Sequence, residues 1–269
     1  MTCPPLPEAD ALAERFAAIA LAAAGPVMEV YARGAHPRVK SDRSPVTDAD
    51  ERAEAVILEA LARELAGVPV VSEEAVAREG APTVGEDFVL VDPLDGTREF
   101  LARNGEFTVN IALVRAGAPV CGVIFAPAMR RLWLAGARAF AVDCAAGGML
   151  PARAVWRGIV TRAPDLSPVA LVSRSHPDER TRAFLDDLGV GERRAHGSSL
   201  KFGLIAEGEA DVYPRFGPTM AWDIAAGDAI VRAAGGIVLD EAGKPMRYGP
   251  GNGFRNGGFV AWGRAPHVA

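Results

Sequence analysis

Three short acidic motifs constrain the fold of this chain more than any other feature, because each lies where an apolar run ends or a helix begins. They are SEE at residues 72–74, DPLDGT at residues 92–97 and WD at residues 222–223. A fold that unites them places several carboxylates around one point. Carboxylate oxygens are ligands that Mg²⁺ prefers. The sequence therefore predicts a magnesium site assembled from distant parts of the chain.

The central motif follows a run that is typical of a buried strand. Residues 88–91 read FVLV, so the first aspartate of the motif stands at the strand exit. Because Pro93 cannot donate to a neighbouring strand, we expect the strand to end there, with a turn at the Asp-Gly pair. Thr97 is the expected N-cap of a helix over residues 98–101. Carboxylates for a metal would then lie beside helix N–H groups that suit phosphate.

The residues that flank the other two motifs predict where these motifs lie in the fold. Residues 68–71 favour a short strand that delivers Glu73 or Glu74 on the following loop. An alanine-rich run over residues 224–234, ended by two glycines, predicts a buried helix with Asp223 in its first turn. Each aspartate could instead cap a helix or form a turn. The conjunction of all three motifs favours the metal site.

The aspartate motifs resemble the signature pair of the inositol-monophosphatase superfamily, whose members are Mg²⁺-dependent, lithium-sensitive phosphatases. The second signature reads WDIAAG at residues 222–227, with Ile224 where threonine is more frequent. Further segments are similar to the 3'(2'),5'-bisphosphate nucleotidase branch, and the similarity covers most of residues 40–263. These segments are residues 98–113, 198–202, 206–208 and 213–219.

The resemblance implies a layered α-β-α-β-α sandwich of the inositol-monophosphatase/fructose-bisphosphatase type, which is an α/β fold made of an α+β lobe and an α/β lobe. We expect one catalytic unit over residues 1–269, with lobes at about residues 1–160 and 161–269. The polar, proline-bearing stretch 161–168 is the expected boundary. The first lobe would carry an antiparallel sheet and most metal ligands, and the second would bind the substrate.

Hydrophobic periodicity predicts the main elements along the chain. Expected helices cover residues 9–31, with a disturbance at Gly25-Pro26, and then residues 50–65, 178–188 and 198–207. Expected strands cover residues 107–114, 119–125, 131–134, 139–142, 152–156, 169–173, 210–213, 237–239 and 259–262.

The resemblance also implies roles for individual residues. Asp92 would bridge two ions, and the backbone N–H groups of Gly96 and Thr97 would bind the scissile phosphate. Glu73 and Thr97 would orient the attacking water, with support from Asp50. Two or three Mg²⁺ ions and inhibition by Li⁺ are implied as well. The implied metal ligands are Glu73, Asp92, the carbonyl oxygen of Leu94, Asp95 and Asp223.

The second half of the chain carries further candidates for substrate binding. Ser198 and Lys201 are three residues apart, which would place them on one face of a helix, and Arg215 follows a strand-like run. Lysine and arginine suit phosphate, although exposed charges are commonly only solvated. His176 could touch the base or ribose, or be an ordinary loop residue. The predicted substrate-binding set is Glu73, Leu94, Asp95, Gly96, Thr97, His176, Ser198, Lys201, Arg215 and Asp223.

The resemblance favours a phosphoric monoester hydrolase that removes the 3'-phosphate from adenosine 3',5'-bisphosphate, giving AMP and phosphate, and so serves sulfur assimilation. The sulfated form of that nucleotide is a second candidate substrate. An alternative is an inositol monophosphatase or another sugar phosphatase, which the nucleotidase-like segments at residues 98–113 and 198–219 disfavour. A catalytically silent nucleotide- or metal-binding protein is disfavoured because every implied metal ligand is present.

Composition excludes other classes of protein. With 49% hydrophobic residues, a formal charge of −5 and scattered basic residues, the chain predicts a large core and no binding of nucleic acid polymers. Three cysteines without metal-type spacing favour free thiols in a reducing cytoplasm. We expect no secretory leader and no transmembrane segment. The family allows oligomers and peripheral association with the inner membrane.

Overall fold

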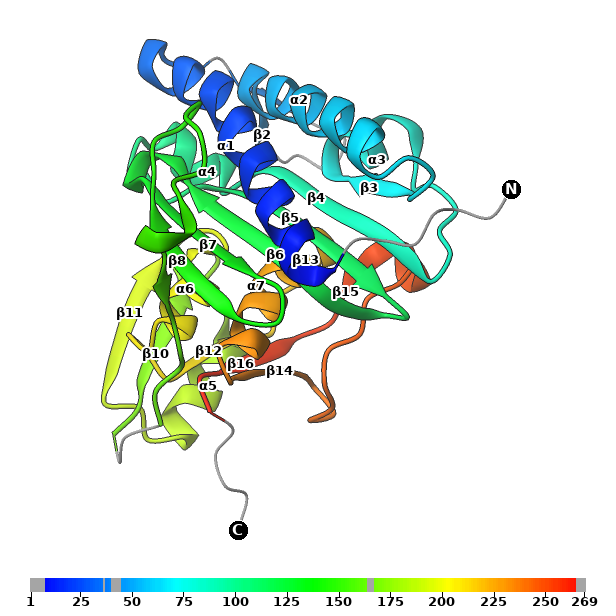
Figure 1. The fold of residues 1–269 in the computed structure, drawn as a ribbon. Coiled ribbons are helices and arrows are strands. Elements are labelled where there is room, and N and C mark those ends of the chain that lie inside the picture. The colour runs from blue at the N-terminus through cyan, green and yellow to red at the C-terminus, as the bar shows by residue number, and fades with distance from the viewer. Residues whose placement is uncertain (1–7, 36, 40–44, 164–166, 265–269) are drawn as a thin grey trace.

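The computed structural model describes residues 8–35, 37–39, 45–163 and 167–264. Its helices and sheets form five layers in the order α-β-α-β-α (Figure 1). Helices α1 and α2 cover one face of a seven-stranded sheet, while α6 and α7 lie between that sheet and a five-stranded one, which α5 covers on its far side. The predicted fold class is confirmed.

The seven-stranded sheet is antiparallel except at one edge, where β3 and β4 run parallel. The antiparallel strands predicted from residue 107 to residue 142 are confirmed. The strand predicted at residues 152–156 is wrong, because that segment forms the short 3₁₀ helix η2 (Arg153–Val155). In spatial order the strands are β3 (Val70–Ser72), β4 (Asp87–Asp95), β5 (Thr108–Arg115), β6 (Ala118–Ala126), β7 (Arg131–Ala135), β8 (Ala139–Asp143) and β9 (Arg157–Gly158).

The five-stranded sheet contains the strands predicted in the second half of the chain, together with β11, which we did not predict. In spatial order its strands are β11 (Glu192–His196), β10 (Val169–Ser173), β12 (Val212–Arg215), β16 (Phe259–Trp262) and β14 (Ile237–Asp240). Two short two-stranded sheets and two further 3₁₀ helices complete the secondary structure of the described residues outside the α-helices. They are β1 (Arg38–Val39) with β2 (Pro45–Val46), β13 (Thr219–Met220) with β15 (Arg255–Asn256), η1 (Pro127–Met129) and η3 (Gly251–Phe254).

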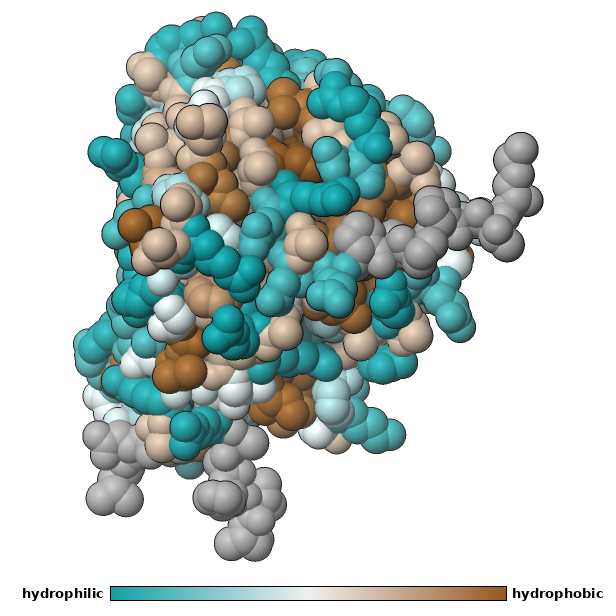
Figure 2. Space-filling model, in the orientation of Figure 1, coloured by the Kyte–Doolittle hydropathy of each residue, from teal (hydrophilic) through white to brown (hydrophobic). Residues whose placement is uncertain are grey.

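Helix α1 is continuous through Pro26, and by length and hydropathy alone it could cross a membrane. More than half of its most apolar 18-residue stretch is nevertheless buried. Phe16 and Val27 pack in the core beside the seven-stranded sheet. Figure 2 shows hydrophobic and hydrophilic side chains interspersed on this face of the molecule. The helix therefore has the burial of a core helix. The helices are α1 (Ala9–Arg33), α2 (Asp48–Glu64), α3 (Glu73–Glu79), α4 (Thr97–Leu101), α5 (Glu179–Asp187), α6 (Leu200–Ala206) and α7 (Ala221–Ala233).

The two large sheets fall on either side of the predicted lobe boundary, of which residues 164–166 lie outside the described residues. One hydrophobic core joins them, because Leu90 and Ile124 of the first sheet pack in the same cluster as Ile230 of α7 and Phe259 of the second. The division into lobes stays a prediction. The continuous core fixes the strand ends of the two sheets relative to each other.

Candidate active site

Three carboxylates from distant parts of the chain meet at one point. Oxygen atoms of Glu73, Asp92 and Asp223 all lie within 4.8 Å of one another. Because Ser72 pairs with Val91 in the parallel strands β3 and β4, the residues that follow this pair, Glu73 and Asp92, lie at the same end of the two strands. Asp223 comes from the first turn of α7, which packs across β4, β5 and β6. Glu73 opens α3 rather than lying on a loop, which corrects the prediction.

Strand β4 does not end at Pro93 as predicted, but continues to Asp95 through a bulge. Asp92 pairs with Asn110 and Asp95 pairs with Thr108, so three steps along β4 match two along β5. A bulge tolerates proline, because no ladder hydrogen bond is needed there. The N–H of Leu94 donates instead to Asp92 Oδ1 at 3.0 Å.

The turn after the bulge also differs from the prediction. Gly96 is the N-cap of α4, with a left-handed φ of 88°, and Thr97 is the first helical residue rather than the cap. A Cβ at Gly96 would lie 3.1 Å from both the Glu106 carbonyl oxygen and Ser198 Cβ. This position therefore requires glycine both for its φ and for the close packing.

Thr97 and Asp50 form a pair beside the triad. Thr97 Oγ1 lies 3.4 Å from Asp50 Oδ1 and 3.4 Å from the carbonyl oxygen of Leu94. The buried Asp50 carboxylate is fixed by α2, since its Oδ2 accepts from the backbone N–H and the hydroxyl of Thr47, both at 2.8 Å. Asp50 thus closes the capping box of α2 while its second oxygen faces Thr97.

Asp95 lines the same cavity but lies outside the group of three carboxylates that meet within 4.8 Å. Its Oδ2 accepts hydrogen bonds from Ser198 Oγ at 2.9 Å and from the Ser199 N–H at 2.6 Å. The charge of Asp95 still acts on the triad. Burial, then Asp95, then Glu73 raise the pKa of the Asp223 carboxyl well above its usual range. Like charges gathered in this way favour a bound cation.

Asp223 makes the capping contact that the sequence left open and is also a member of the triad. Its Oδ2 accepts from the Met220 N–H at 2.8 Å, which caps the start of α7, while the carboxylate belongs to the triad.

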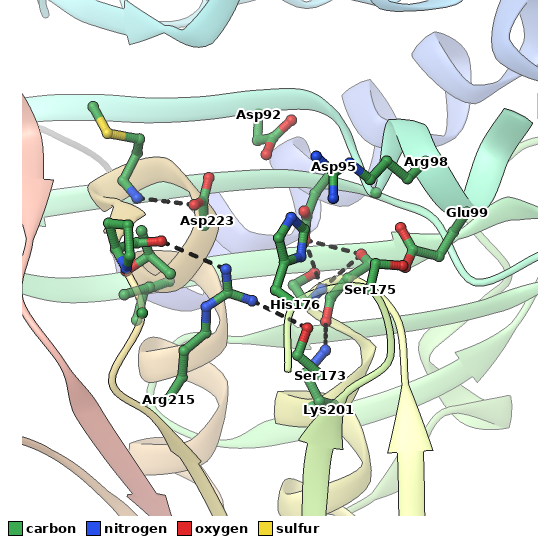
Figure 3. A pocket seen from close by; sticks show the side chains of 18 of the residues that line it. Asp92, Asp95, Arg98, Glu99, Ser173, Ser175, His176, Lys201, Arg215 and Asp223 are labelled. Atoms are coloured by element: carbon green, nitrogen blue, oxygen red, sulfur yellow. Dashed lines mark hydrogen bonds between the residues drawn. The ribbon is translucent and has the colours of Figure 1, made fainter. Parts of the chain in front are cut away.

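The triad forms the acidic end of a cavity of about 890 Å³, which Asp95, His176, Lys201 and Arg215 also line (Figure 3). This volume is typical of a small-molecule site. Basic side chains also line the cavity, and we call them together the basic wall: Arg98, His176, Lys201, Arg215 and Arg255. Burial, followed by the charges of Arg215 and Arg98, lowers the pKa of His176. One cavity therefore contains carboxylates that favour a bound cation and a basic wall that favours a bound anion.

The predicted helical face of Ser198 and Lys201 is wrong. Ser198 precedes α6 with a left-handed φ of 53°, and the helix begins at Leu200. Lys201 is buried rather than solvated, and its Nζ donates to the carbonyl oxygens of His196 at 3.0 Å and of Ser198 at 2.5 Å. Burial lowers the pKa of Lys201 to about 8. Its ammonium group therefore holds the loop that precedes α6.

Arg215 is the last residue of β12, and its Nη1 donates to Ser173 Oγ at 3.3 Å. Its Nε is buried without a hydrogen-bond partner among the described residues. Two further arginines of the cavity, Arg98 and Arg255, were missed by the sequence analysis. Arg98 could have been found, because it follows Thr97 directly in the central motif.

The sequence profile of the Inositol monophosphatase family matches residues 10–262. The chain belongs to this family. Its members are metal-dependent phosphatases, generally with Mg²⁺, so the predicted assignment as a phosphoric monoester hydrolase is confirmed.

Within the inositol monophosphatase family, the chain is similar to proteins named as 3'(2'),5'-bisphosphate nucleotidases. The 3'(2'),5'-bisphosphate nucleotidase CysQ of Salmonella typhimurium is 43% identical over 250 residues, which cover 91% of this chain and 97% of that protein. The CysQ of Escherichia coli K12 is 43% identical over 237 residues, covering 87% and 92%. The crystal structure of CysQ from Bacteroides thetaiotaomicron has a TM-score of 0.78 at 36% identity, covering 94% of this chain and 97% of that one.

Proposed function

We propose that the protein is a Mg²⁺-dependent 3'(2'),5'-bisphosphate nucleotidase that hydrolyses the 3'-phosphate of adenosine 3',5'-bisphosphate to AMP and phosphate. The observation that carries the proposal is the union of an acidic triad and a basic wall in one cavity. A substrate with two anionic groups suits such a cavity, because the ester to be cleaved can lie at bound cations while the other group faces arginine. Similarity to the CysQ nucleotidases supports the choice of a nucleotide.

The residues at the acidic end fit Mg²⁺. Every side-chain donor is a carboxylate, and the pKa of Asp223 is raised by burial and then by the negative charges of Asp95 and Glu73, which a cation would neutralise. We assign Glu73, Asp92 and Asp223 as ligands, with Asp95 and the carbonyl oxygen of Leu94 completing the set. When bound, two or three Mg²⁺ ions would neutralise the phosphate and lower the pKa of a water, and Li⁺ would inhibit by replacing one of them.

Glu73 of the triad and the Thr97–Asp50 pair beside it would place the attacking water. We assign Glu73 and Thr97 to bind it, and Asp50 to orient the Thr97 hydroxyl across the 3.4 Å that separates them. The N–H groups of Gly96 and Thr97, at the start of α4, would donate to the phosphate. Hydrolysis by this route needs no covalent intermediate with the protein.

The basic wall would bind the rest of the nucleotide. We assign His176, Ser198 and Arg215 to contact it, because all three line the cavity. Arg215 lines the cavity, and its buried Nε has no hydrogen-bond partner among the described residues. Lys201 would act through its charge and through the loop that it holds, since its ammonium group already binds two carbonyl oxygens.

Phosphate release from adenosine 3',5'-bisphosphate and from myo-inositol 1-phosphate, with and without Mg²⁺, tests the proposal. We expect a strong preference for the nucleotide, loss of activity without Mg²⁺ and inhibition by Li⁺. A preference for the inositol phosphate would overturn the nucleotidase assignment while keeping the phosphatase.

We further propose a cytoplasmic location and a small-molecule substrate, which the burial of α1 and the family membership support. The peripheral membrane association gains no support and is not proposed. An oligomeric state stays a prediction.

A further inference from the structure

Glu106 belongs to the nucleotidase-like segment before β5, but the proposed reaction gives it no role. Its side chain is 9% exposed and accepts both arms of the Arg174 guanidinium, from Nε at 2.7 Å and from Nη2 at 2.8 Å. Its Oε2 also accepts from the Gly197 N–H at 2.8 Å, and His196 Nδ1 lies 3.4 Å from its Oε1. A buried carboxylate with this set of donors is held in one orientation.

The partners of Glu106 lie on two loops of the other sheet. Arg174 follows β10 directly and Gly197 follows β11 directly, and Ser173 pairs with His196 at the ends of these parallel strands. Arg174 also binds β11, through its Nη2 to the Ala195 carbonyl oxygen at 2.6 Å. Glu106 therefore ties both strand ends to the sheet that carries Asp92.

The same two loops form the substrate wall, which we define as residues 173–178 and 196–201. Ser175 and His176 follow Arg174, and Ser198 follows Gly197, and all three line the cavity. A second buried carboxylate, Glu99, accepts a hydrogen bond from the Ser175 hydroxyl. The wall is thus fastened at two points from the segment that links β4 to β5.

Close packing supports the same arrangement. A Cβ at Gly197 would lie 2.4 Å from Glu99 Cγ and 2.9 Å from the Glu106 carbonyl oxygen, so only glycine allows the backbone to approach these side chains. The hydrogen bonds of Glu106 lead to the wall rather than to the triad. Glu106 is linked to the acidic residues only indirectly. The loop that it holds at Gly197 continues to Ser198, whose hydroxyl donates to Asp95.

We propose that Glu106 is a positioning residue that fixes the substrate wall relative to the acidic triad. Its negative charge holds Arg174 and Gly197, and through them sets the places of His176 and Ser198. The inference rests on the proposed function only for the choice of nucleotide in the assay.

Steady-state kinetics of Glu106→Gln test this role. The amide places an NH₂ group against donors that now meet a carboxylate oxygen. We expect KM for adenosine 3',5'-bisphosphate to rise about tenfold, the change expected when a charge-assisted hydrogen bond is lost, with a smaller fall in kcat. KM for p-nitrophenyl phosphate, which lacks a nucleoside to contact the wall, should stay within about twofold.

Asp211→Asn is the matched control. The Asp211 side chain is fully buried and also accepts an arginine fork, from Arg162 at 2.8 and 2.7 Å, together with the Val169 N–H at 2.7 Å. It lies just before β12, at the end away from Arg215. This variant should lose comparable thermal stability without changing the KM for the nucleotide.

Arg174→Lys provides a second test should Glu106→Gln fail to fold. It keeps the positive charge but loses the paired hydrogen bonds that the guanidinium donates to Glu106. Here KM for the nucleotide should rise about threefold. An unchanged KM in the folded variants, or an equal rise with p-nitrophenyl phosphate or in Asp211→Asn, would overturn the positioning role. Failure of the proposed function would appear separately, as a different preferred ester in the unmodified protein, and the KM ratio would then be measured with that ester.

Discussion

Glu54 determines where the triad residue Glu73 lies, and replacing it should damage both stability and metal use. The Glu54 side chain is 3% exposed, and its Oε1 accepts from Ser72 Oγ at 2.5 Å and from the Ala75 N–H at 2.8 Å. Ser72, the N-cap of α3, makes no side-chain capping bond of its own. A glutamate of α2 therefore caps the helix that Glu73 opens.

The loss in Glu54→Ala can be worked from these contacts. The buried Ser72 hydroxyl would lose its acceptor, at about 2 kcal/mol, and α3 would lose its cap, at about 1 kcal/mol. The ion pair with the half-exposed Arg78 adds little. We expect the free energy of unfolding to fall by about 3 kcal/mol. The Mg²⁺ concentration for half-maximal activity should rise about tenfold, because Glu73 is no longer oriented.

Urea unfolding and a Mg²⁺ titration of phosphate release measure the two effects. Glu59→Ala on the same helix is the control, since Glu59 is exposed and pairs only with Arg63 among the contacts described. It should change stability by less than about 0.5 kcal/mol. A Glu54→Ala protein within about 1 kcal/mol of the unmodified one, with the same Mg²⁺ dependence, would refute the reasoning.

Three further predictions address the triad, the packing and the pH dependence. Asp92→Asn should lower phosphate release at least about 100-fold while keeping or raising thermal stability, because one of several buried like charges is removed; unchanged turnover would contradict its assignment as a ligand. Gly197→Ala should lower the free energy of unfolding by about 1–3 kcal/mol because its Cβ meets Glu99, whereas Gly158→Ala, which meets nothing within 4 Å, should be nearly neutral in the same denaturation assay. Burial raises the pKa of Asp228 to about 6. Between about pH 4 and pH 6 the folded protein therefore keeps a proton on this carboxyl that the unfolded chain has released. The stability of the unmodified protein relative to Asp228→Asn should therefore fall by about 1 kcal/mol between pH 5 and pH 7, and a flat difference would show that the carboxyl is not perturbed.

Elements with a strong hydrophobic pattern could be predicted from the sequence, and those set by tertiary contacts could not. Strand β10 was predicted to the residue, because its first four residues, VALV, form an apolar run. Strand β11 was missed, because ERRAH is a polar edge strand whose pairing with β10 decides its conformation. The bulge that carries β4 through Pro93 likewise depends on the register with β5.

The candidate site shows the same division. Glu73, Asp92 and Asp223 could be predicted to meet, because each comes just after an apolar run or lies in the first turn of a recognisable helix. The commitment of Asp95 to the loop at Ser198 could not, because that loop leaves β11, a polar strand without a sequence signal. The burial of Lys201 was hidden for a similar reason: its charge indicates a solvated or phosphate-binding side chain, whereas the fold surrounds it with backbone carbonyl groups.

The central claim is that one cavity holds cations at its acidic end and a nucleotide along its basic wall. A crystal structure of the protein with Mn²⁺ and AMP, the proposed product, tests it most directly, because the anomalous signal locates the metal independently of the nucleotide. The account predicts anomalous peaks bounded by Glu73, Asp92 and Asp223, with the nucleotide against His176 and Arg215. Metal peaks away from the triad, or a nucleotide bound outside this cavity, would contradict it.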